Sequence, residues 1–106
     1  MDAGKLDRRV LFQSKRRVET PAGGWTDGWT DEFTVWAQVK PLRGGETVMQ
    51  ARMAAKNPVI VIVRASSQTR RIEHNWRVMI DGSPYEIRET PRLREARDGF
   101  EMLAEG

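Results

Sequence analysis

Residues 77–88, RVMIDGSPYEIR, form the clearest local pattern in this chain. Branched aliphatic residues occupy every second position before the Asp81-Gly82 pair, and the same spacing returns after it at Tyr85 and Ile87. Two alternating runs joined by Asp-Gly are typical of a β-hairpin, because Asp and Gly tolerate the positive φ angles of a tight turn. The stretch therefore predicts two antiparallel strands.

Further strands are predicted on both sides of this hairpin. Residues 33–42 alternate between apolar and polar, which is typical of a half-buried strand. Residues 59–63, VIVIV, are apolar on both faces and predict a central strand. Shorter strands are expected at 6–14 and 99–104. About six short strands without a long helix predict a mainly β protein, a small antiparallel β-barrel, with a compact sandwich as the alternative.

The segment 18–32 contains one Pro and three Gly, and it predicts a long hairpin loop. Trp25 and Trp29 are unusual in such a loop. Either they fold back and cap the barrel, or they anchor a neighbouring subunit, since Trp is enriched at interface hot spots.

The remaining segments complete a single domain over residues 1–106. Residues 43–57 are expected to form an inserted loop that carries a short helix with a thin apolar face. Residues 1–5 are expected to be a flexible N-terminal arm. The longest apolar run, 59–63, is too short to span a membrane, so we expect a cytoplasmic protein without membrane contact.

The composition argues against an enzyme. The chain has no Cys and a single His, His74, so it offers neither a thiolate site nor a recognisable metal-ligand or nucleophile–base pattern. We expect no cofactor and no metal. The formal charge of +3 comes from 18 basic and 15 acidic residues spread along the chain. This balance fits either an ordinary solvated surface or weak, sequence-independent contact with DNA phosphates.

A small β-barrel that binds nucleic acid is one alternative. Such modules stack bases on exposed aromatic residues beside basic side chains. Trp36 shares a predicted strand face with Lys40, and Trp76 precedes Arg77. The aromatic residues are not clustered on one strand, so structural roles in core and rim are favoured.

Several stretches together resemble the small head-tail joining proteins of tailed bacteriophages, also called head-closure or stopper proteins. They are GKLDRRV at 4–10, VWAQVKPL at 35–42, and YEI at 85–87, with Gly23-Gly24 and Trp29 between the first two. Each is weak alone, but their order in a chain of this length is specific.

The resemblance implies a non-enzymatic virion neck protein that is assembled in the host cytoplasm. It would form a ring of about twelve copies beneath the portal and its adaptor, retain packaged double-stranded DNA and offer an attachment face to a tail protein. A tail-side completion protein of similar size is the alternative.

The resemblance also implies two groups of functional residues. The channel or gating loop would comprise Arg43, Gly44, Gly45, Glu46, Met49, Arg52, Met53 and Lys56. The contacts to a neighbouring subunit or to the adaptor would comprise Lys5, Leu6, Arg8, Arg9, Trp25, Trp29 and Trp36.

Overall fold

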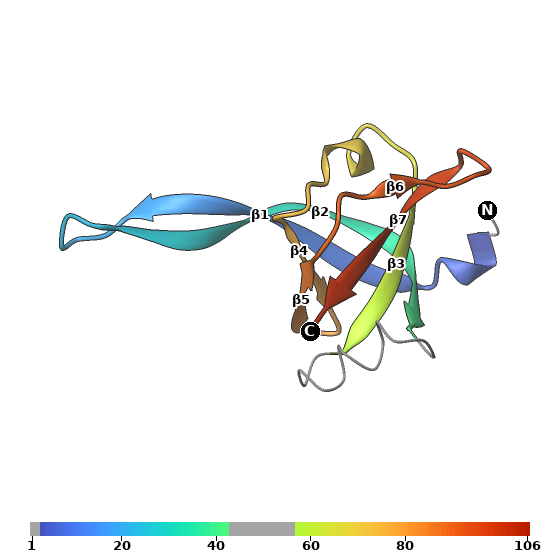
Figure 1. Ribbon diagram of the computed structural model, residues 1–106, viewed down its shortest axis with the longest axis horizontal. Coiled ribbons are helices and arrows are strands. Elements are labelled where there is room, and N and C mark those ends of the chain that lie inside the picture. The colour runs from blue at the N-terminus through green and yellow to red at the C-terminus, as the bar shows by residue number, and fades with distance from the viewer. Residues whose placement is uncertain (1–2, 43–56) are drawn as a thin grey trace.

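The computed structural model describes residues 3–42 and 57–106, and Figure 1 shows their arrangement. The described residues form seven strands in one sheet, which confirms the prediction of a mainly β protein. The strands are β1 (Arg8–Glu19), β2 (Trp25–Pro41), β3 (Pro58–Arg64), β4 (Arg77–Ile80), β5 (Ser83–Ile87), β6 (Arg92–Leu93) and β7 (Gly99–Glu105). Two single-turn 3₁₀ helices, η1 (Ala3–Lys5) and η2 (Thr69–Arg71), complete the elements.

The sheet closes on itself. Its strand order is β3-β2-β1-β4-β5-β7-β6, and β3 also pairs with β7. All these pairings are antiparallel. Six strands thus form a ring, and β6 pairs with the start of β7 along the edge that β5 also uses. The ring leaves β3 without an open edge, as the apolar run at 59–63 predicts.

The hydrophobic core lies inside the ring of strands. Every strand of the ring contributes side chains that are almost completely buried, and Phe12 and Met102 are the largest of them. The rings of Phe12 and Phe33 lie 5.4 Å apart, and Trp76 lies 6.0 Å beyond Phe33. Trp76 and Ile72 belong to the connection between β3 and β4, so this connection adds apolar cover to the core.

The Asp81-Gly82 hairpin is confirmed in detail. Ile80 pairs with Ser83, which leaves a two-residue loop between β4 and β5. Asp81 has φ 51° and Gly82 has φ 80°, so both central residues adopt the left-handed conformation of a type I′ turn.

The predicted long loop at 18–32 is wrong. β1 continues to Glu19 and β2 begins at Trp25, so the loop shrinks to residues 20–24. Thr20 closes it, because the backbone N–H of Gly24 donates to Thr20 Oγ1 over 3.0 Å and the Gly23 N–H donates to the Thr20 carbonyl over 3.0 Å. Hydrogen bonds across the two strands, rather than burial of an apolar face, make this polar stretch β-structure.

The other expectations have mixed outcomes. The predicted gating residues at 43–56 lie outside the described residues, as does the expected short helix. Residues 3–5 of the expected N-terminal arm form η1, and Leu6 behind it is buried. The ends of the insertion are described: the Leu42 N–H donates to the Pro58 carbonyl over 3.2 Å, and the Asn57 N–H donates to the Gly106 carbonyl over 3.3 Å.

The type I′ turn gives a direct test of the hairpin. A Cβ at Gly82 would meet no atom within 4 Å, so the cost of Gly82→Ala is the left-handed backbone alone. We expect a loss of about 1–2 kcal/mol in the free energy of unfolding, measured by chemical denaturation. Gly24→Ala is the matched control, because Gly24 lacks a positive φ and its Cβ would make only ordinary contact at 3.5 Å. Equal losses in the two variants would contradict the turn assignment.

Candidate interface on the projecting ribbon

The outer halves of β1 and β2 form a two-stranded projection, which we call the ribbon (residues 14–30). β4 pairs with β1 only as far as Gln13, and β3 pairs with β2 only from Ala37 onward. Within the described pairings, the ribbon strands therefore bond only to each other. Figure 1 shows the ribbon extending well away from the body of the molecule. An isolated two-stranded hairpin is only marginally stable in water. The length of the ribbon therefore points to a role in function.

A β-bulge marks the base of the ribbon. Phe12 faces Phe33, whereas Gln13 faces Asp31, so Glu32 is an extra residue in β2. Because side chains alternate along a strand, one extra residue reverses their phase. The bulge thereby places Trp29 on the same outer face as Trp36, although Trp36 follows seven positions after Trp29 and a regular strand would put them on opposite faces.

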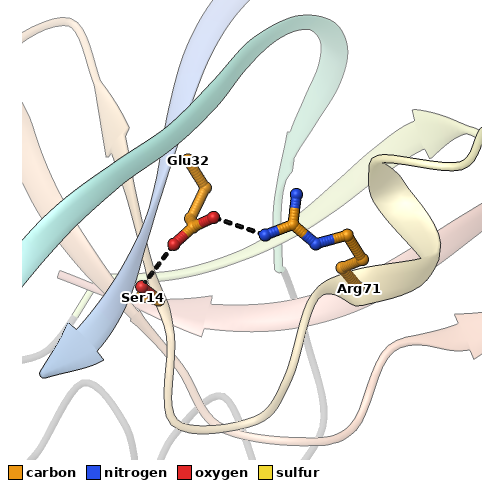
Figure 2. Close-up of polar contacts among 3 residues, drawn as sticks. All are labelled: Ser14, Glu32 and Arg71. Atoms are coloured by element: carbon orange, nitrogen blue, oxygen red, sulfur yellow. Dashed lines mark hydrogen bonds and ion pairs between the residues drawn. The ribbon is translucent and has the colours of Figure 1, made fainter.

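The carboxylate of Glu32 ties the bulge to the body, as Figure 2 shows. Ser14 Oγ donates to one carboxylate oxygen over 2.7 Å, and the Arg71 guanidinium donates to the other over 2.5 Å. The Ser14 hydrogen bond is the main cause of a lowered pKa at Glu32, and the hydrogen bond and charge of Arg71 reinforce it against partial burial. Glu32 thus links β1, β2 and η2 in its charged form.

Three of the four tryptophans carry an arginine over the indole ring. Arg9 lies 5.1 Å from the ring centroid of Trp36, Arg77 lies 4.4 Å from that of Trp29, and Arg17 lies 5.9 Å from that of Trp25. Such cation–π pairs order an arginine without neutralising it. The outer face of β1 and β2 therefore combines aromatic surface with oriented positive charge.

The tip of the ribbon is the most exposed apolar point described. Trp25 is 62% exposed and Val18 is 44% exposed. Glu19 faces Trp25 across the two strands, and Lys15 forms an ion pair with Asp27 over 3.3 Å further down. Trp25 does not fold back onto the body, so the capping role is wrong for this residue. Trp29 is half-buried at the ribbon base, where it packs under Arg77.

A groove lies on the body at the opposite end of β1. It has a volume of about 310 Å³ and contains the half-exposed ring of Trp36. It is lined by Leu6, Arg9, Thr34, Val35, Trp36, Arg64, Ser66, Gln68 and Thr69. Buried Thr69 shapes one wall, since its hydroxyl donates to the Arg64 carbonyl over 2.8 Å and accepts from the Ser66 N–H over 2.9 Å.

Five of the seven predicted interface residues thus divide between two separate places. Leu6, Arg9 and Trp36 meet in the groove, whereas Trp25 and Trp29 lie on the ribbon. Arg8 belongs to neither, because it forms an ion pair with Asp81, and Lys5 is exposed at the end of η1. Sequence reasoning missed Glu19 and Arg64, because only the strand register and the fold reveal what lies beside them.

The described residues offer no candidate for catalytic chemistry. No group of three or more His, Asp or Glu side chains within residues 3–42 and 57–106 is placed to hold a metal. His74 is exposed beside a hollow of about 140 Å³ that Lys15 and Trp29 also line. Trp76 is buried in the core and cannot stack a base. No helix in the described part of the chain is long and apolar enough to span a membrane.

Comparison with known families decides between the classes of function that the sequence left open. The family model described as phage head completion protein matches residues 1–105. The chain belongs to this family. The resemblance that the sequence motifs indicate is thereby confirmed, and so is the expectation of a non-enzymatic protein, because phage head completion proteins are structural components of the virion. No curated protein matches the chain.

Solved structures share the fold of this head completion protein. The solution structure of protein SF1141 from Shigella flexneri 2a has a TM-score of 0.70 and 21% identity, over 98% of this chain and 95% of that chain. A chain from the virion of a native gene transfer agent particle has a TM-score of 0.65 and 23% identity, over 93% of this chain and 92% of that chain. These similarities establish the fold over nearly the whole length.

The bulge predicts a specific pH dependence. A lowered pKa in the folded state adds stability above the ordinary pKa of glutamate, and this stability is lost as the pH falls through the folded value. We expect Glu32→Gln to lower the thermal midpoint of unfolding at pH 7. The gap in thermal midpoint between the variant and the wild type should narrow as the pH falls below about 4.3. Glu89→Gln, at an exposed position, is the control. A gap that is constant from pH 7 to pH 3 would contradict the ionic role of Glu32.

The two ribbon tryptophans should differ in their effect on stability. We expect Trp29→Ala to lower the free energy of unfolding by about 1–3 kcal/mol, because it removes half-buried apolar surface and the Arg77 stacking. Trp25→Ala at the exposed tip should change it by less than about 0.5 kcal/mol. Urea denaturation of both variants measures the difference, and a larger loss for Trp25→Ala would show that the tip packs on its own body.

Proposed function

We propose that this head completion protein forms a ring of about twelve copies in the virion neck, beneath the portal and its adaptor. There it retains the packaged DNA and offers the attachment face for the tail. The match of the head completion family to residues 1–105 carries the proposal, because it covers both the body and the ribbon.

The fold suits a small unit of a ring wall. We propose that the closed ring of six strands is a compact β-barrel, since its side chains fill the interior and every ring strand has two neighbours. The likeness to a chain from a gene transfer agent virion supports this use of the fold in a particle. A small domain leaves much of its surface in water, so contacts between copies would add to its stability.

The surface supports contacts with other proteins more than a chemical role. Lys5, Leu6, Arg8, Arg9, Trp25, Trp29 and Trp36 remain our proposed contacts with neighbouring copies or the adaptor. The net charge of +3 is compatible with weak phosphate contact in a DNA channel, without sequence preference.

A tail-side completion protein is the second candidate, since the head completion family does not by itself distinguish between docking partners. The nucleic-acid-binding module is less well supported. Of the aromatic residues considered for it, Trp76 is buried, and Trp36 is half-exposed with the Arg9 guanidinium already stacked on its ring.

Particles from a lysate that lacks only this chain provide the test. We expect electron microscopy to show heads without tails, and an assay of protected DNA to show that they have lost most of their genome. Expression of the wild-type chain in the same lysate should restore tailed, filled particles, which excludes effects on neighbouring genes.

The outcomes separate the alternatives. Tailless heads that keep their DNA would contradict DNA retention and leave only tail attachment. Filled heads with malformed tails would favour the tail-side protein. Intact, tailed and filled particles would contradict the neck role altogether.

A further inference from the structure

The ribbon tip carries an exposed indole and an exposed carboxylate side by side. The ring of Trp25 is 62% exposed, and Glu19 faces it directly across the strands. Glu19 is exposed and forms no ion pair with the described residues. The Arg17 guanidinium lies 5.9 Å from the centroid of this indole and forms no ion pair with Glu19. The exposed ring beside the Glu19 carboxylate fits a complementary surface that is apolar at its centre and basic at its rim.

The groove on the body has these properties. Leu6 and Trp36 supply its apolar lining, and Arg9 and Arg64 supply positive charge. Neither arginine forms an ion pair with a side chain in the described ranges, and Arg9 is held in place by its stacking on Trp36. Its volume of about 310 Å³ accommodates a large aromatic side chain.

The tip cannot reach the groove of its own chain. Arg9 and Glu19 lie on the same strand, ten residues apart, which corresponds to about 33 Å in an extended strand. Figure 1 shows the straight ribbon leading away from the body, with the start of β1 at the far end. The continuous β1–β2 ladder holds the tip and the groove apart within one chain, so a contact between them requires another molecule.

We propose that the ribbon tip of one copy docks into the groove of the next copy. Trp25 enters between Leu6 and Trp36, and Glu19 approaches Arg64 at the rim. The two surfaces differ, so the contact is head-to-tail, and repetition of such a contact produces a closed ring when the rotation between copies permits it. This inference rests on the proposed ring and names the contact that would build it.

Chemical cross-linking in particles tests the contact. The chain has no cysteine, so introduced pairs are the only reactive thiols in this protein. Thr26→Cys combined with Gln68→Cys places one thiol at the tip, beside Trp25, and one in the groove, and it leaves Glu19 intact. Thr26→Cys combined with Glu89→Cys is the control, since Glu89 is exposed and does not line the groove. Each variant replaces the wild type in particles, which are treated with a short bis-maleimide and analysed by denaturing electrophoresis.

We expect a ladder of linked copies for the 26/68 pair and none for the 26/89 pair. Tailed, filled particles that give no ladder with 26/68, or that link residue 26 to a different virion protein, would overturn the docking contact and leave the neck function standing. Failure of the neck function itself is seen separately, as intact particles in the lysate that lacks the chain.

Charge reversal supplies a second measurement that does not depend on thiols. Glu19→Arg and Arg64→Glu should each reduce the yield of tailed, filled particles by about tenfold, and the double variant should restore most of it. Both side chains are exposed, so circular dichroism of the purified variants should match the wild type. A double variant that is as defective as the product of the single effects would overturn the Glu19–Arg64 pairing.

Discussion

The continuous ladder between β1 and β2 governs the layout of both the body and the ribbon. Its inner half presents Val10, Phe12 and Ala37 to the core, and its outer half is the ribbon. The bulge at Glu32 joins the two halves and adjusts the phase of the side chains between them. A single pair of strands therefore both builds the body and fixes where the exposed tip lies relative to the groove.

The parts of the fold that bury apolar surface could be predicted from the sequence. Residue types match the local environment in three places: the alternation after Phe33, the β-branched run at 59–63 and the Asp81-Gly82 turn. The residue types of the ribbon do not indicate its strands in this way. Its strands are polar, rich in turn-forming residues and held by hydrogen bonds to each other, so residues 18–32 have the composition of a loop although most of them form strands.

The candidate site was only partly predictable for the same reason. Tryptophan at an interface is a compositional expectation, and the structure adds to it that Trp25 and Trp36 are exposed. The stacking of Arg17 on Trp25 and of Arg77 on Trp29 depends on the register between β1 and β2. That register depends on the bulge at Glu32, and a glutamate at this position does not predict a bulge. The separation of the ribbon tip from the groove likewise follows from the length of β1, which no sequence motif predicts.

We propose that this head completion protein closes the neck as a ring of identical copies. Cryo-electron microscopy of the neck in intact particles would show whether this ring is present. We expect a ring of about twelve copies between the portal with its adaptor and the tail, with each ribbon lying against the next body. Density for this chain elsewhere in the particle, or as a single copy without neighbours of its own kind, would contradict it.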